Sequence, residues 1–83
     1  MTIIVKVKLF AAARELTGAA EVELELPDRA TIADAKHTLS TLFPQIAGLL
    51  SRSAIARNQD YAVDTDIITP TDELAVIPPV SGG

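Results

Sequence analysis

The chain has 83 residues, a formal net charge of −4 and a hydrophobic fraction of 48%. A chain of this length is expected to form one small domain, spanning residues 1–83, that buries about 60% of the surface its unfolded chain exposes. The absence of cysteine excludes disulfides, thiolate metal sites and a cysteine nucleophile, and a single histidine excludes a multi-histidine metal centre. The Lys and Arg residues are scattered, so we expect no nucleic-acid partner, and no apolar run approaches the roughly 18 residues of a membrane span.

The first two regular segments, residues 3–10 and residues 21–26, alternate between apolar and polar side chains, which predicts half-buried strands. Their inward-facing residues are Val5, Val7 and Leu9 in the first and Val22, Leu24 and Leu26 in the second. We expect the strands to pair antiparallel, with the lysines of one opposite the glutamates of the other on the solvent side. Residues 11–18 contain helix formers and end at Gly18, which predicts a short turn or helical loop.

Lys6 and Lys8 interrupt the first apolar run, which is not the pattern of a signal peptide. The absence of cysteine suits a reducing compartment. We therefore expect a cytoplasmic protein.

The next segment is predicted to be the main helix. Thr31 and Asp34 have the spacing of a capping box at its start, and Pro44 ends it. Asp34 is thus better explained as a cap than as a catalytic acid, and His37 lies on the polar face, where we expect it to be solvated. The apolar arc of the helix consists of Ile32, Ala35, Leu39, Leu42 and Phe43. Residues 45–51 form a compact connector whose expected core residues are Ile46, Leu49 and Leu50.

The last part of the chain is predicted to contain three strands. Residues 54–57 and 61–63 flank a polar turn formed by Asn58-Gln59-Asp60. The loop over residues 64–73 is expected to bury Ile67 and Ile68, and it ends in a turn at Pro70-Thr71-Asp72-Glu73, with proline at the second position or just before it. Residues 74–77 are apolar throughout, so this strand is covered on both faces or docks a partner through one of them.

This order of elements predicts an α+β fold in which a mixed sheet packs on one main helix. The last strand cannot form a hairpin with the first, so we expect it to lie beside the first strand in parallel. That is the ubiquitin-like β-grasp arrangement. A flexible tail, residues 80–83, is expected to extend from it.

The tail carries the most distinctive chemistry in the sequence. Pro78 and Pro79 stiffen the exit from the sheet, and Gly82 and Gly83 lack a Cβ, so the chain can pass through a narrow channel. The only functional group at its tip is the carboxylate of Gly83. Once activated as an acyl-adenylate, it can accept an amine to give an isopeptide or sulfur to give a thiocarboxylate. Gly-Gly by itself also fits a frayed terminus.

Three segments resemble the small subunit of molybdopterin synthase, the MoaD type. They are FAAARELTG (Phe10 to Gly18), NQDY (Asn58 to Tyr61) and DELAVIPPVSGG (Asp72 to Gly83). The resemblance covers the whole chain and is most specific at PPVSGG. The family often has Asp-Gly-Asp-Glu where this chain has Pro70-Thr71-Asp72-Glu73, a departure that affects the type of turn rather than the tail.

The resemblance implies a sulfur carrier that is not itself catalytic. A MoeB-type enzyme, which uses ATP and Mg²⁺, would adenylate Gly83, and a sulfur donor would convert it to a thiocarboxylate. The threading residues would be Pro78, Pro79, Val80, Ser81 and Gly82. The tail would enter a MoaE-type large subunit, which holds the active site, and supply the sulfurs of molybdopterin made from cyclic pyranopterin monophosphate. The family assembly is a heterotetramer of two small and two large subunits, and the resemblance implies no cofactor bound by this chain.

A docking face is expected beside the tail. If Leu74 and Val76 face the helix, Ile77 joins Phe10 on the opposite, open face of the sheet, with Tyr61 near them. These three positions match apolar interface residues of the family, and exposed apolar groups next to a tail are typical of an interface. Alternatively, Phe10 and Ile77 cap the sheet edge or fill a minor core. Arg14 and Glu15 are either contacts at the rim of the interface or an exposed ion pair.

Other functions remain open at the level of sequence. The same fold and tail suit a protein modifier that forms isopeptides with lysines. They also suit a sulfur carrier for thiamine or cysteine synthesis, although the AREL and PPVSGG segments fit those relatives less well. A binding module with an uninformative terminus is a further alternative.

Overall fold

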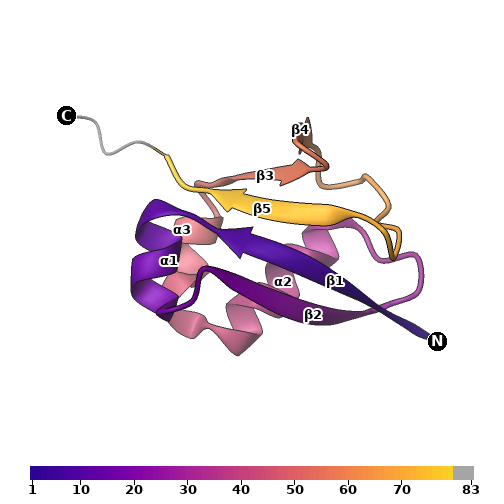
Figure 1. The fold of residues 1–83 in the computed structure, drawn as a ribbon, viewed down its shortest axis with the longest axis horizontal. Helices are drawn as coiled ribbons and strands as arrows, with labels where there is room; N and C mark the ends of the chain where they lie inside the picture. Colours follow the sequence, from indigo (N-terminus) through magenta and orange to yellow (C-terminus); the bar gives the residue numbers. More distant parts are fainter. Residues whose placement is uncertain (80–83) are drawn as a thin grey trace.

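A mixed five-stranded sheet with the strand order β2-β1-β5-β3-β4 forms the framework of the computed structural model, which describes residues 1–79 (Figure 1). The strands are β1 (Thr2–Leu9), β2 (Glu21–Pro27), β3 (Ala54–Arg57), β4 (Asp60–Ala62) and β5 (Glu73–Ile77). The helices are α1 (Ala11–Thr17), α2 (Ile32–Leu42), the 3₁₀ turn η1 (Pro44–Ile46) and α3 (Ala47–Leu50). Strand β1 pairs antiparallel with β2 and parallel with β5, which confirms the predicted β-grasp fold.

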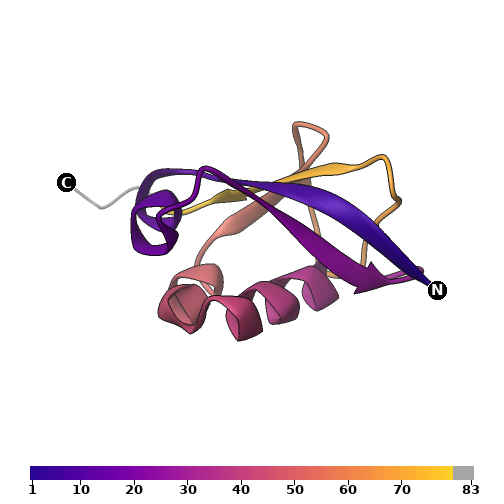
Figure 2. The same cartoon turned by 60° about the horizontal axis from the view of Figure 1, so that its bottom comes forward.

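The core lies between the sheet and α2, which runs along one face of the sheet (Figure 2). The predicted alternation is confirmed, because Val5, Val7 and Leu9 of β1 are almost completely buried. The core is completed by side chains from every layer, namely Leu24, Leu26, Ile32, Leu39, Ile46, Leu50, Ile68, Leu74 and Val76. Burial of these aliphatic groups is the main stabilising contribution in a domain of this size.

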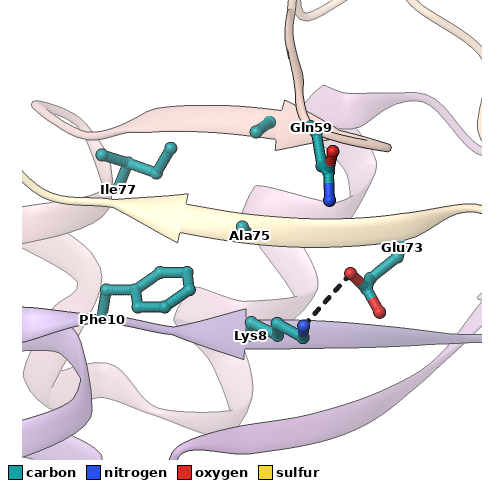
Figure 3. A pocket seen from close by; sticks show the side chains of 7 residues that line it. Lys8, Phe10, Gln59, Glu73, Ala75 and Ile77 are labelled. Atoms are coloured by element: carbon teal, nitrogen blue, oxygen red, sulfur yellow. Dashed lines mark ion pairs between the residues drawn. The ribbon is translucent and has the colours of Figure 1, made fainter.

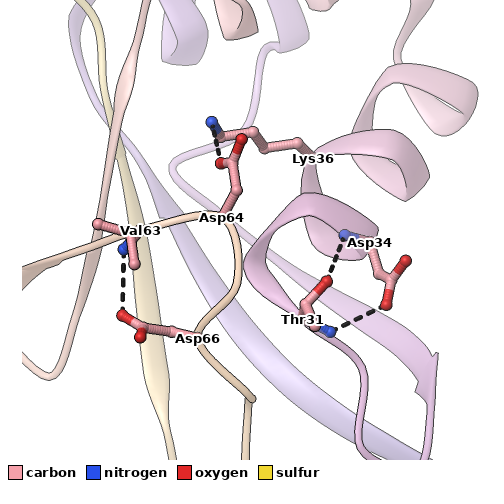
Figure 4. Close-up of polar contacts among 6 residues, drawn as sticks. All are labelled: Thr31, Asp34, Lys36, Val63, Asp64 and Asp66. Atoms are coloured by element: carbon pink, nitrogen blue, oxygen red, sulfur yellow. Dashed lines mark hydrogen bonds and ion pairs between the residues drawn. The ribbon is translucent and has the colours of Figure 1, made fainter.

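Helix α2 begins at the predicted capping box. The Asp34 N–H donates to the Thr31 hydroxyl (3.3 Å), and the Thr31 N–H donates to the Asp34 carboxylate (2.9 Å; Figure 4). Two further N–H groups of the first turn, those of Ile32 and Ala33, donate to backbone carbonyls of the loop after β4. The same loop supplies Asp64, which forms an ion pair with Lys36 at 2.7 Å. The start of α2 is therefore held by both local and tertiary hydrogen bonds.

Two residues predicted to lie in the core are exposed. Leu42 has 56% of its surface accessible, because it lies at the margin of the apolar arc and is the last residue of α2. Ile67 is 49% exposed, whereas the adjacent Ile68 is buried. Consecutive residues of an extended chain point to opposite sides, so only one of these two isoleucines can enter the core.

Several boundaries differ from the prediction. The first strand ends at Leu9, and Phe10 is the N-cap residue of α1, the segment expected to be a turn or helical loop. Gly18 ends that helix in the left-handed conformation (φ 73°), as its position indicated. Strand β4 begins at Asp60 rather than at Tyr61. In the turn before β5, the Asp72 N–H donates to the Thr69 carbonyl, which places Pro70 at the second position.

Candidate functional site

The sheet face opposite α2, here called the open face, is crossed by one row of directly paired residues. Lys8 on β1 pairs in register with Ala75 on β5, Ala75 pairs with Ala56 on β3, and Ala56 pairs with Tyr61 on β4. Directly paired residues point to the same side of a sheet, so these four form one row across the open face. Small residues thus occupy the middle of the row and larger ones its two ends.

A hollow of about 240 Å³ lies over this row (Figure 3). It is lined by Lys8, Phe10, Ala56, Gln59, Glu73, Ala75 and Ile77. One end of the hollow is apolar and carries both Phe10 and Ile77 (Figure 3). The other end is polar, where Lys8 and Glu73 form an ion pair at 3.3 Å near the amide of Gln59.

The structure brings together two of the predicted interface residues and separates the others. Phe10 is 47% exposed and faces the hollow with the partly buried Ile77. Tyr61 is 78% exposed and lies in the row across the open face but does not line the hollow. Arg14 belongs to a separate hollow of about 430 Å³ on α1, which it lines with Ala11, Glu15 and Gly18.

Of the predicted tail, the structure describes only the base. Pro78 is half-buried and Pro79 is exposed, directly after the end of β5. Val80, Ser81, Gly82 and Gly83 lie outside the described residues. Because Ile77 immediately precedes Pro78, the apolar end of the hollow lies beside the point where the tail leaves the sheet.

The polar end of the hollow is held by a network that sequence reasoning missed. Asn58 and Gln59 form the turn between β3 and β4 with φ of 53° and 74°. The Asn58 side-chain amide donates to the Asp72 carboxylate (2.8 Å), and its amide oxygen accepts from the Glu73 N–H (2.9 Å). The Asn58 N–H donates in turn to the Glu73 carbonyl (2.8 Å). The two chain segments that carry Gln59 and Glu73 are therefore joined.

Asp72 in this network has a perturbed pKa. Burial raises the pKa of the Asp72 carboxyl. Hydrogen bonds from Thr69 and Asn58 and the positive charge of Arg57 outweigh that effect, so this pKa lies below the ordinary value of 3.8. The carboxylate is thereby kept in the form that accepts both hydrogen bonds.

The charged rows on β1 and β2 face each other as predicted, but their ion pairs differ. In register, Lys6 is opposite Glu23 and Lys8 is opposite Glu21. Lys6 pairs diagonally with Glu21 at 3.8 Å, whereas Lys8 reaches across to Glu73 on β5. Exposed pairs of this kind contribute less than about 1 kcal/mol each, so they affect the surface more than the stability.

The described residues, 1–79, also bear on the expectations about metal sites, membrane spans and His37. Among these residues no group of three or more His, Asp or Glu side chains could hold a metal ion. No helix in the described part of the chain is long and apolar enough to span a bilayer. His37 is exposed on α2, where it was expected.

The chain is similar to known proteins over most of its length. The model of the ThiS family matches residues 7–83. A molybdopterin synthase sulfur carrier subunit of Arabidopsis thaliana is 42% identical over 79 residues, which cover 95% of this chain and 82% of the relative. The crystal structure of SAMP1 from Haloferax volcanii superposes with a TM-score of 0.86 at 30% identity, covering 96% of this chain and 99% of the other.

A more distant structure shows the same fold. It is a complex of subunits 1 and 2 of the molybdopterin-converting factor from Helicobacter pylori 26695, matched with a TM-score of 0.70 and 18% identity over 98% of this chain and 100% of the other. Phe10 and Ile77 were predicted from sequence to share the open face, whereas the hollow and its other lining residues were found only in the structure. Ala56, Gln59 and Glu73 could have been placed from sequence only with the register of β3 against β5.

Proposed function

This chain belongs to the ThiS family, and we propose that it is a sulfur carrier in molybdenum cofactor biosynthesis, the small subunit of a molybdopterin synthase. The observation that carries this proposal is the 42% identity to the Arabidopsis thaliana sulfur carrier subunit over 95% of the chain. The family match also extends through Gly82 and Gly83, the two residues on which the chemistry depends.

In this proposal the reactive group is the carboxylate of Gly83. It attacks the α-phosphate of ATP on a MoeB-type, Mg²⁺-dependent enzyme, and pyrophosphate leaves. A sulfur donor then displaces AMP from the acyl carbon, which gives a thiocarboxylate. Within a MoaE-type large subunit the sulfur passes to cyclic pyranopterin monophosphate. A side-chain-free tip suits this task, because glycine can enter a channel that excludes any Cβ.

The partner surface in this proposal is the open face. The base of the tail, at Pro78, directly follows Ile77 at the apolar end of the hollow. A partner that covers Phe10 and Ile77 therefore also lies next to the base of the tail, and apolar centres with polar rims are typical of such interfaces. Tyr61 extends this surface along β4, and Arg14 and Glu15 on α1 would contact its rim. We further propose a heterotetramer of two small and two large subunits in the cytoplasm.

The first test is the mass of the intact protein. After incubation with the MoeB-type enzyme, ATP, Mg²⁺ and a sulfur donor, the mass should rise by the difference between one sulfur and one oxygen. The product should then support molybdopterin formation when added to the large subunit and cyclic pyranopterin monophosphate. An unchanged mass, or full molybdopterin synthesis by a variant that lacks Gly83, would contradict the proposal.

A second candidate is a protein modifier, which the likeness to SAMP1, the small archaeal modifier protein 1 of Haloferax volcanii, favours. Here the adenylated Gly83 would be attacked by a lysine amine of another protein, giving an isopeptide and AMP. Conjugates of high mass that depend on Gly83 would support this activity. A sulfur carrier for thiamine or cysteine synthesis would also form the thiocarboxylate, so the pterin assay separates it from the leading proposal.

A further inference from the structure

The size of the hollow on the open face indicates what it can hold. Pockets that bind cofactors or drug-sized ligands measure about 300–1,000 Å³. The hollow measures about 240 Å³ and is open to solvent through exposed residues such as Phe10 and Gln59. It therefore lies below the usual range for ligand pockets, and its size suits one protruding side chain.

The shape of the hollow depends on two alanines. Ala56 and Ala75 form its floor, on the adjacent strands β3 and β5, and Phe10 and Ile77 rise beside them. Ala75 is only half-buried although β5 lies at the centre of the sheet. Larger side chains at these two positions would fill the space above the sheet, so the hollow exists because both residues are small.

The apolar end of the hollow favours an uncharged occupant. The charged groups, Lys8 and Glu73, pair with each other at 3.3 Å at the opposite end, where both side chains remain partly exposed. An occupant that carried a charge would be desolvated next to Phe10 and Ile77 without compensation. An aliphatic or aromatic side chain would gain from the same burial.

Gln59 places a hydrogen-bonding group at the hollow. It has a φ of 74° in a two-residue hairpin turn, where Asn-Gly is the favoured sequence. Glutamine at this position costs stability relative to glycine. Its amide lies over the hollow at the polar end, beside the Lys8–Glu73 pair.

We propose that the hollow is the receptor for a single bulky, uncharged apolar side chain of the large subunit, and that the Gln59 amide hydrogen-bonds the partner backbone next to that side chain. This inference rests on the proposed function, because it concerns the interface that delivers the tail. Ala56 and Ala75 then determine partner specificity because their small side chains leave room for the side chain of the partner. Phe10 and Ile77 contribute in a different way, through attractive contacts with it.

The first experiment fills the hollow. Binding of the purified large subunit from the same organism is measured by calorimetry for the wild type, Ala75→Leu and a matched control, Ala33→Leu, at an exposed position of α2. Ala75→Leu should weaken binding by about tenfold or more, as expected for a blocked central contact. Ala33→Leu should bind like the wild type.

The outcomes separate this inference from the proposed function. If the wild type does not bind the large subunit, the proposed function fails and the inference fails with it. If the wild type and Ala75→Leu bind equally well, only the inference is overturned. Melting temperatures verify that the variants are folded, and Ala75→Val replaces Ala75→Leu if the larger side chain prevents folding.

The second experiment uses Gln59→Gly. The fold should become as stable or more stable, because glycine adopts positive φ without strain. Binding to the large subunit should weaken by about fivefold, the factor that one hydrogen bond is worth. A purely structural role for Gln59 predicts unchanged or tighter binding, and that result would overturn its assignment.

Discussion

Individual residues in this chain adopt backbone conformations that their side chains disfavour. Ala11, Arg29 and Gln59 have positive φ, and the left-handed region costs such residues about 1–2 kcal/mol, whereas Asn58, which also has positive φ, tolerates it. Ala11, with φ of 48°, lies where the chain turns from β1 into α1, directly after Phe10. The backbone conformation at Ala11 thus helps to determine the position of Phe10.

Replacing Ala11 tests this strain. Ala11→Gly should raise the free energy of unfolding by about 0.5–1 kcal/mol, because relief of the left-handed strain exceeds the entropic cost of glycine. The measurement is urea denaturation. The control, Ala12→Gly in the next position of α1, should lower the free energy of unfolding by a similar amount. A loss of stability in both variants would show that Ala11 is not strained.

The Asp72 carboxylate should make the fold sensitive to acid. Because its pKa in the folded state lies below the ordinary value of 3.8, its stabilising contribution is present above that pH. The contribution is lost as the pH falls through the lower pKa of the folded state. In Asp72→Asn, stability should therefore vary less with pH below about 4, as urea unfolding at a series of pH values would show.

A matched control for this effect is Asp28→Asn, which removes an exposed carboxylate in the turn after β2. The stability of Asp28→Asn should follow the pH profile of the wild type more closely than the stability of Asp72→Asn does. If Asp72→Asn and the wild type had the same acid profile, the network with Asn58 and Thr69 would not hold the carboxylate in its charged form.

Among the elements, α2 depends most clearly on its first turn. Thr31→Ala removes the side-chain acceptor for the Asp34 N–H and should lower the free energy of unfolding by about 1 kcal/mol. Thr41→Ala, near the end of the helix, removes only a bond to the His37 carbonyl and should have little effect or stabilise slightly. Thermal unfolding of both variants provides the comparison, and equal losses would argue against a specific role of the cap.

Strand β5 shows how one apolar segment can serve two purposes. Leu74 and Val76 are buried against the helix layer, while Ala75 and Ile77 are only partly buried and line the hollow. Of the two alternatives for such a strand, burial on both faces or one face that docks a partner, the second is the one that the exposure of Phe10 and the hollow support.

For the whole molecule, stability and partner binding should separate between the two faces of the sheet. Phe10→Arg should weaken binding to the large subunit with little change in melting temperature, because Phe10 is 47% exposed on the open face. Leu24→Ala, on the buried face, should lose about 2–5 kcal/mol of stability. A large drop in melting temperature for Phe10→Arg would show instead that Phe10 is a core residue.

The main elements of the fold could be predicted because their signals are local. Period-two alternation identified β1 and β2, and Thr31 with Asp34 marked the start of α2. Leu42 and Ile67 were wrongly predicted to be buried. The position of a residue in a helix or a loop does not by itself show whether that residue reaches the core. The hollow could not be predicted, since Ala56 and Ala75 look like ordinary strand residues until β3 lies beside β5.

The sequence by itself determined the alternating strands, the capped helix and the Gly-Gly ending on which the proposed sulfur chemistry depends. Each of these is set by residues close to one another along the chain. Tertiary structure alone decided that Lys8 pairs with Glu73 and that two alanines leave a hollow next to Phe10 and Ile77. These residues are far apart in sequence, and their relative placement depends on the registers of β5 with β1 and with β3.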